Sequence, residues 1–200
     1  MNNLRRRNPL EELKIQASIL LKDLNSDEPE KFLKATARFK NLPHYAEKSA
    51  EEIGLLKSEI KRKHVLAVLA AERGFKTWSE LRDDIISKEC LHRPMGGSSF
   101  LNHWFAKYDE AREQLEKHGG YLLQYRDSYF VCESGYIKFL GLDSFKNEWE
   151  KIGYDWVKPA DKKAWEVIFK KAKENYLLDP VSFKKKEFFK TFKARNNENK

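Results

Sequence analysis

A histidine, a tyrosine and two cationic residues in the second half of the chain are the residue types that could carry out catalysis. Histidine and tyrosine exchange protons, and arginine or lysine stabilises the negative charge that develops on a phosphate group. If folding brings His103, Tyr125 and Arg126 together, they predict a small metal-independent ribonuclease or toxin-like enzyme centred on His103. Lys107 is a further cation close to His103 in the sequence. In the alternative interpretation, His103 and Asn102 only satisfy backbone groups at a buried corner.

The sequence argues against cysteine, metal and cofactor chemistry. Cys132 could be a nucleophile activated by His103 or His118, but it lies in an apolar run, where a buried and inert cysteine is more common. The histidines are scattered, and the chain has no HxxxH, HExxH or CxxC pattern. Gly96 and Gly97 are not followed by the lysine and hydroxyl residue of a phosphate-binding loop. We therefore predict no metal site and no cofactor.

Positive charge is concentrated at the end of the chain. Residues 158–200 contain 13 lysine and arginine residues against 6 aspartate and glutamate residues, whereas the first 157 residues contain 26 and 25. We predict a last helix with Lys186, Lys190 and Lys193 along one side and phenylalanines on the other. Lysines mixed with aromatic rings suit the phosphates and bases of nucleic acid. The same pattern suits an acidic protein, a partner's groove, a membrane surface, or docking on the domain with the lysines in water.

The first half of the chain has the pattern of several capped helices. Asn8 can cap a helix that has Pro9 in its first position, and Ser49 with Glu52 forms a capping box. Gly74 stands where a helix would end in a left-handed residue. Apolar residues recur at helical spacing between these signals, so we predict a helical bundle. The apolar stripe of the first helix consists of Leu10, Leu13, Ala17, Leu20, Leu21 and Leu24.

The stretch 64–85 has the outline of a helix-turn-helix motif. A second helix that reads DNA should be neutral or basic and should present arginine, lysine, asparagine or glutamine to the bases. Residues 78–87 instead contain Glu80, Asp83 and Asp84 against a single arginine, which gives a net charge of −2. Because binding in the groove depends on neutralising phosphates, we predict that this helix packs in a helical core and does not read DNA.

One set of spaced residues runs through the same stretch: His64, Leu66, Val68, Ala71, Gly74, Phe75, Trp78 and Leu81. This pattern resembles the small helical domain of bacterial glyoxalase-related proteins. The resemblance covers residues 10–88 and implies a helical module of a bacterial protein. It does not imply glyoxalase activity, because the chain shows no βαβββ modules with paired histidine and glutamate metal ligands.

The second half of the chain has a different pattern and predicts a small α+β unit. Residues 121–127 and 129–134 are short aromatic and β-branched runs with a turn signal between them, as in a β-hairpin. Helices are predicted at residues 109–117 and from about residue 160 onward. The predicted fold class is therefore α+β, mostly α, with an N-terminal helical bundle, a small α+β unit with a β-hairpin, and a basic C-terminal helix.

Four segments follow from these patterns. We predict a helical bundle domain over residues 1–88 and a linker over residues 89–98, where proline, glycine and serine cluster. A small α+β domain follows over residues 99–178, and a basic amphipathic helix and tail occupy residues 179–200.

Composition predicts a cytoplasmic protein with no integral membrane association. No apolar run approaches the roughly 18 residues that span a bilayer, and no apolar stretch follows the basic N-terminal residues. The two cysteines, Cys90 and Cys132, are expected to be reduced thiols. We predict a non-enzymatic bacterial accessory or interaction module, with nucleic acid or an acidic protein as its partner. The alternatives are the ribonuclease centred on His103 and a regulatory partner of a separately encoded enzyme.

Overall fold

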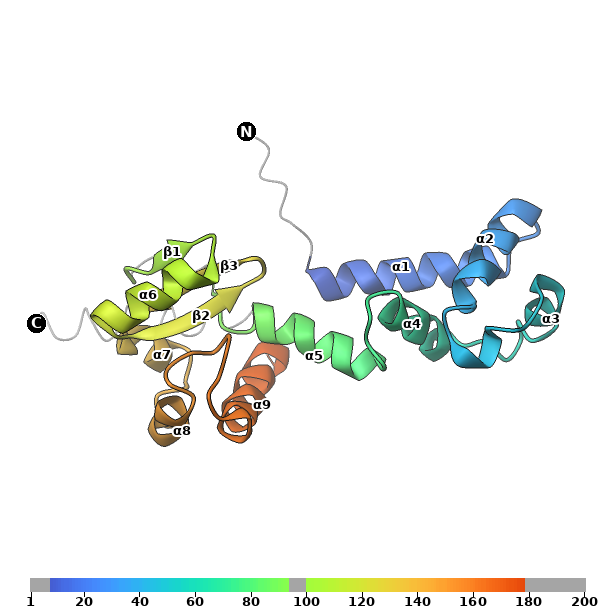
Figure 1. Ribbon diagram of the computed structural model, residues 1–200. Helices are drawn as coiled ribbons and strands as arrows, with labels where there is room; N and C mark the ends of the chain where they lie inside the picture. Colours follow the sequence, from blue (N-terminus) through green and yellow to red (C-terminus); the bar gives the residue numbers. More distant parts are fainter. Residues whose placement is uncertain (1–7, 94–99, 179–200) are drawn as a thin grey trace, which may run out of the picture. The chain divides into compact units, whose positions relative to one another are not determined.

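The computed structural model describes residues 8–93 and 100–178, which form a mostly helical α+β structure (Figure 1). Within these ranges the strands form one three-stranded antiparallel sheet, and helices supply most of the remaining regular structure. The predicted fold class is therefore confirmed. The chain divides into two compact units, which we call the N-terminal unit, residues 1–85, and the C-terminal unit, residues 86–200.

The N-terminal unit contains short helices joined by tight turns. Prolines begin its first two helices, where the missing N–H group costs no hydrogen bond. The elements are α1 (Pro9–Leu24), α2 (Pro29–Phe39), the 3-10 helix η1 (Pro43–Tyr45), α3 (Ala50–Leu55), α4 (Arg62–Ala71) and the first residues of α5 (Trp78–Glu89).

The predicted helix ends of this unit are present. Asn8 Oδ1 accepts a hydrogen bond of 2.9 Å from the N–H of Leu10. Ser49 and Glu52 form the predicted capping box, with reciprocal bonds of 3.2 and 2.6 Å. Gly74 has a φ of 79°, a left-handed conformation that lets the chain turn after α4 at little cost.

The apolar faces of these helices meet in one core. The predicted stripe of α1 is confirmed, with Leu21 only partly buried, and α1 packs on both α2 and α4. Leu81 of α5 is buried, and Trp78 packs against the same core, as predicted for a packing helix. The fully buried members of the core include Ala17, Leu24, Phe39, Ile53, Val65, Val68 and Leu69.

The C-terminal unit is built around a small sheet with strand order β1-β3-β2. The predicted hairpin is confirmed, and its turn is formed by Arg126, at a φ of 54°, and Asp127. β1 was not predicted; it adds a third strand to the edge of the hairpin. The elements are β1 (His103–Phe105), α6 (Tyr108–His118), β2 (Tyr121–Tyr125), β3 (Ser128–Cys132), α7 (Ser134–Phe139), α8 (Lys146–Lys151) and α9 (Lys162–Leu178).

Different helices pack on the two faces of this sheet. α6 packs its Ala111 and Leu115 on Leu122 and Val131 of one face. On the other face, the Phe130 ring meets Tyr136 of α7 with a ring-centroid distance of 5.8 Å. α8 also packs there through Trp149, and α9 packs on α8. The sheet is therefore covered on both sides by helices.

The predicted linker is only partly consistent with the structure. Glu89, Cys90 and Leu91 are buried within the C-terminal unit, so these three residues are not an exposed connection. The Leu91 carbonyl accepts a hydrogen bond of 2.9 Å from the Tyr136 hydroxyl, and the Glu89 carboxylate accepts one of 2.6 Å from Arg126. Residues 94–98 of the predicted linker, and the predicted basic helix over 179–200, lie outside the described residues.

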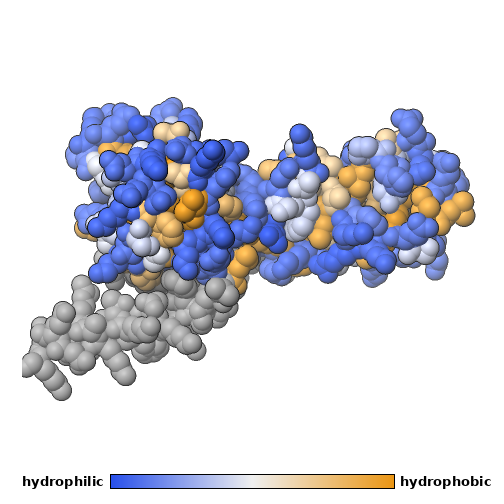
Figure 2. Space-filling view, turned by 90° about the horizontal axis from the view of Figure 1, so that it is seen from below, coloured by the Kyte–Doolittle hydropathy of each residue, from blue (hydrophilic) through white to orange (hydrophobic). Residues whose placement is uncertain are grey.

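Hydrophilic residues cover most of the face drawn in Figure 2, and hydrophobic residues appear there in small patches between them. Among the described residues, no helix combines the length and the apolar character needed to cross a membrane.

Candidate functional site

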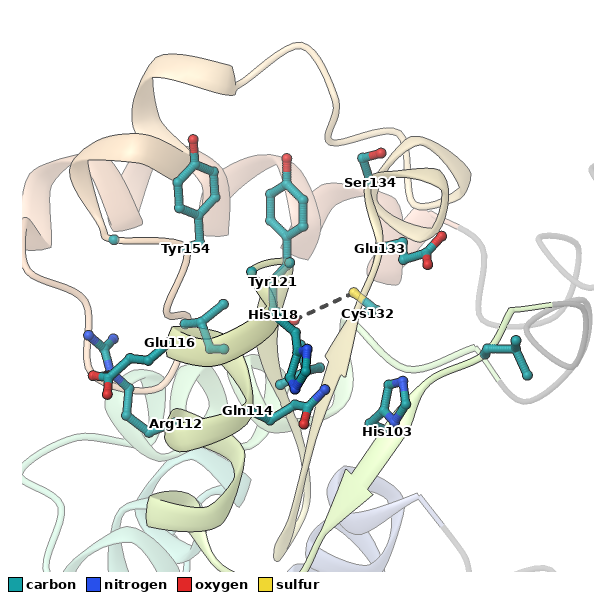
Figure 3. Close-up of a pocket in the computed structure, with 16 residues that line it drawn as sticks. His103, Arg112, Gln114, Glu116, His118, Tyr121, Cys132, Glu133, Ser134 and Tyr154 are labelled. Atoms are coloured by element: carbon teal, nitrogen blue, oxygen red, sulfur yellow. Dashed lines mark hydrogen bonds and ion pairs between the residues drawn. The ribbon is translucent and has the colours of Figure 1, made fainter.

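A groove of about 630 Å³ lies in the C-terminal unit at the end of α6 (Figure 3). Its walls come from α6, the start of β1, the end of β3 and the turn after α8. The polar side chains that line it include His103, Gln114, His118, Tyr121, Glu133 and Tyr154.

Two glycines create the groove by turning the chain sharply from α6 into β2. Gly119 has a φ of 70° and donates a hydrogen bond of 2.8 Å to the Leu115 carbonyl, which ends the helix. Gly120 has a φ of 106°, and a Cβ atom there would lie only 2.7 Å from the Cys132 carbonyl oxygen. At this turn Tyr121 pairs with Cys132 in the sheet, and both residues line the groove.

The groove carries more negative than positive charge. Its one lining arginine, Arg112, is neutralised by Glu116 at 2.8 Å and by Asp155 at 3.3 Å. Glu133 is exposed, and no ion-pair partner for it lies among the described residues. The C-terminal turn of α6 forms one wall and adds the partial negative charge of a helix end. The groove therefore favours a cationic or hydrogen-bond-donating ligand.

Two tyrosines form the rim opposite the histidines. The rings of Tyr121 and Tyr154 meet edge to face, with centroids 5.3 Å apart, and Figure 3 shows their hydroxyl groups pointing the same way. Burial, together with Tyr154 and Cys132, raises the pKa of Tyr121, so its hydroxyl stays protonated and can donate a hydrogen bond. Aromatic faces next to carboxylates are a common arrangement for holding an ammonium or guanidinium group.

His103 and His118 come from different elements and line the same groove. His103 begins β1 and His118 ends α6, and both side chains are exposed (Figure 3). Two imidazoles in one groove can donate and accept hydrogen bonds from a single ligand. This arrangement corrects the alternative interpretation in which His103 was buried at a corner.

The structure does not bring together the three residues predicted for a ribonuclease. His103 pairs with Val131, whereas Tyr125 pairs with Ser128, so they lie three residues apart along the sheet, about 10 Å, and on strands that are not neighbours. Alternation along the strands also puts His103 on the face covered by α6 and Tyr125 on the opposite face. The convergence of His103, Tyr125 and Arg126 that the ribonuclease alternative requires is therefore not found in the structure.

Tyr125 and Arg126 have structural contacts instead. The Tyr125 ring stacks on His92 with a centroid distance of 3.9 Å. The guanidinium group of Arg126 donates a hydrogen bond of 2.6 Å to Glu89, and the Arg126 N–H donates to the Lys88 carbonyl at 3.0 Å. These contacts fasten the hairpin turn to the end of α5.

The other predicted chemical groups also have defined environments. Cys132 is buried, and burial raises the pKa of its thiol, so the thiolate needed for a nucleophile is disfavoured. Lys107 lies 3.8 Å from Glu110 in an exposed pair outside the groove lining. The predicted nucleic-acid contacts Lys186, Lys190 and Lys193 lie outside the described residues.

Within the described ranges, no group of three or more histidine, cysteine, aspartate or glutamate side chains is arranged to hold a metal ion. Comparison with family models, with curated proteins and with solved structures gives no match to this chain. The resemblance of residues 10–88 to the helical domain of glyoxalase-related proteins therefore stays a prediction.

The groove was not predicted from the sequence, although one sequence signal pointed to it. The pair Gly119-Gly120 between a helix and an aromatic strand marks a reversal with close backbone approach. That signal locates Tyr121 and His118 but gives no information on Glu133 or Tyr154, which reach the groove from other elements.

Proposed function

We propose that this protein is a non-enzymatic interaction module whose C-terminal unit binds a basic peptide segment in the groove at the end of α6. The observation that supports the proposal best is the charge of the groove. Its arginine is neutralised, Glu133 faces it without a partner among the described residues, and a helix C-terminus forms one wall.

The same charges argue for binding in preference to ribonuclease chemistry. A ribonuclease must attract a phosphodiester and stabilise additional negative charge in its transition state. His103 and His118 could serve as an acid and a base, but Glu116 and Glu133 line the same groove and repel a phosphate. A ligand with an ammonium or guanidinium group suits these carboxylates and the tyrosine rim better.

A titration with short peptides tests the proposal. A capped five-residue peptide with two lysines should shift the amide NMR signals of Gly119, Gly120 and Glu133 in a saturable way. Glu133→Lys should weaken binding by about tenfold, because an attraction becomes a repulsion. Asp127→Lys is the matched control, since it changes net charge equally on an exposed turn outside the groove lining and should have little effect. Equal binding of an acidic peptide of the same length would overturn the proposal.

Association with nucleic acid is a second candidate function, and α9 supports it within the described part of the chain. Lys162, Lys163 and Lys170 of this helix are exposed, at the start of the segment that carries most of the positive charge. Single-strand affinity should then fall with salt with a logarithmic slope of about −0.7 for each phosphate neutralised.

The lysines that follow α9 in the sequence provide a test of nucleic-acid association. Replacing Lys186, Lys190 and Lys193 with glutamine should flatten the salt slope by about 2 and weaken all sequences alike. A triple variant with Lys31, Lys34 and Lys40 replaced has the same net charge and should keep the parent slope. If the parent protein binds no single strand at about 50 mM salt, nucleic-acid association is excluded.

A further inference from the structure

One edge of the small sheet lies beside the groove of the C-terminal unit. β1 is the end strand in the order β1-β3-β2, and within the described residues it pairs on one side only, with β3 (Figure 1). The opposite edge is covered, because Leu122 of β2 forms a parallel bridge with Asp155. β1 is therefore the edge at which the described sheet can accept another strand.

The pairing of the strands shows which backbone groups face this edge. In an antiparallel sheet, the N–H and C=O groups of successive residues point to alternate sides of the strand. Leu122 directs both of its groups away from β3, since its N–H donates to Tyr154 at 2.9 Å and its C=O accepts from Trp156 at 3.0 Å. Its partner Val131 therefore directs both of its groups toward β1, where it pairs with His103.

Trp104 is the residue of β1 that this alternation turns outward. His103 and Phe105 direct their backbone groups to β3, so the N–H and C=O groups of Trp104, between them, point away from it. No other backbone partner for these two groups lies among the described residues. An extended peptide that adds to a sheet edge satisfies both groups of such a residue.

The side chains along this edge differ between the two faces of the sheet. Leu101 and His103 line the groove on the side of α6, and Leu101 is 88% exposed. The Trp104 ring lies on the other face, where it stacks on Phe130 with centroids 4.5 Å apart and is still 46% exposed. Because side chains alternate along a strand, a peptide added here places one side chain against Trp104 and its neighbours beside the groove.

We propose that the basic segment bound by this protein adds to the sheet as a strand along β1. The proposal rests on the function proposed above and extends it, because it gives the bound segment a backbone conformation and a side-chain pattern. The residue opposite Trp104 is apolar, and a neighbouring residue carries an ammonium or guanidinium group to the groove. Glu116 and Glu133 line that groove and attract the cation. The ligand is thus an extended segment in which basic and apolar residues alternate.

Backbone N-methylation of a peptide tests the added strand. The parent peptide is capped Ser-Lys-Leu-Lys-Ser, and the leucine and the two lysines are methylated one at a time. Removing the N–H that donates to the Trp104 carbonyl should weaken binding by about tenfold. That N–H belongs to the leucine in an antiparallel strand and to the following lysine in a parallel one. Equal effects at all the methylated positions, whether large or absent, would overturn the proposal.

Hydrogen exchange at Trp104 gives an independent measurement on the protein. In the free protein this amide should exchange rapidly, because its N–H points away from β3. A saturating amount of the parent peptide should slow its exchange by roughly tenfold or more, since the N–H then donates to the peptide. The Phe105 amide, which already faces β3, is the control on the same strand and should change little. Unchanged exchange at Trp104 in the peptide-bound protein would contradict the added strand.

Glu133→Lys separates the failure of this proposal from the failure of the proposed function. If the variant weakens binding but no methylated peptide does, the groove binds the basic segment without β1, and only the added strand is overturned. If the parent peptide does not bind at all, both proposals fail. Position-specific loss on methylation, together with weaker binding to Glu133→Lys, supports both.

Discussion

The two units bury polar groups in different ways. In the described part of the N-terminal unit, Thr36 is the one buried polar residue, and the core around it is almost entirely apolar. The C-terminal unit buries two carboxylates, Glu89 and Asp155, together with a dense group of aromatic rings. Apolar burial tolerates small displacements, whereas a buried carboxylate is costly unless each partner is in place. The stability of the C-terminal unit should therefore depend on a few specific side chains far more than the stability of the N-terminal unit does.

Asp155 is the clearest example of this dependence. Its side chain is 1% exposed and accepts hydrogen bonds from the N–H groups of Val157 and Lys158, both at 2.9 Å. Its other oxygen accepts from the Tyr108 hydroxyl at 2.6 Å and from Arg112 at 3.3 Å. One carboxylate therefore connects α6 to the turn that precedes α9.

The largest expected effect is the loss of this carboxylate. Asp155→Ala should destabilise the C-terminal unit by about 3–5 kcal/mol, because its donors are left without an acceptor. The measurement is denaturant unfolding followed by tryptophan fluorescence, since four of the five tryptophans lie in this unit. Asp161→Ala is the control; this half-buried helix cap accepts hydrogen bonds from the N–H groups of Lys163 and Ala164, and its loss should cost only about 1 kcal/mol. Similar losses for the two variants would show that Asp155 has no special role.

The second prediction tests the apolar core of the N-terminal unit. Leu69 is fully buried there, so Leu69→Ala should cost about 2–5 kcal/mol through lost burial and the cavity left behind. Leu69→Met should cost under about 1.5 kcal/mol, because apolar cores accept a change of shape at nearly constant volume. Hydrogen exchange read by mass spectrometry assigns each loss to its unit. A loss from Leu69→Met as large as that from Leu69→Ala would contradict the tolerance expected of this core.

The third and smallest expected effect is a difference between the two units in how their stability depends on pH. Burial, Arg93 and Arg126 lower the pKa of His92 to about 4, below the ordinary value of 6.5. Because the unfolded chain binds this proton more readily, the C-terminal unit should lose stability as pH falls from about 6.5 to about 4. The expected loss in the free energy of unfolding is on the order of 1–2 kcal/mol, because solvent screens the charge of a partly buried ring.

His92→Phe keeps the stack on Tyr125 and removes the titrating group. The variant should flatten the stability profile of the C-terminal unit over this pH range, and hydrogen exchange in the N-terminal unit should not respond. An unchanged slope in the C-terminal unit would show that His92 does not couple pH to folding.

Several helix ends of the N-terminal unit could be predicted because their signals are local. Asn8, Pro9, Ser49, Glu52 and Gly74 each act on backbone groups within a few residues, so the sequence alone located the ends that they form. The hairpin was predicted for the same reason, since its two strands are joined by a two-residue turn.

The candidate site could be predicted only in part because its residues come from distant segments. His103 was correctly singled out, but its proposed partners lie on the opposite face of the sheet. The sequence shows that neighbouring residues of a strand alternate between faces, but it does not show how β1 is registered on β3. β1 was itself missed, because a three-residue strand has too little periodicity to be recognised.

By itself, the sequence determined the fold class, the ends of several helices, the hairpin and the concentration of positive charge toward the C-terminus. Only the tertiary structure decided which polar groups meet. Arg126 pairs with Glu89, 37 residues earlier, and Tyr108 pairs with Asp155, 47 residues later. The same holds for the groove that collects His103, His118 and Glu133. Local signals determine the backbone conformation over a few residues. Contacts between residues so far apart in the sequence depend on how whole elements pack, and that packing cannot be predicted from any short stretch of sequence.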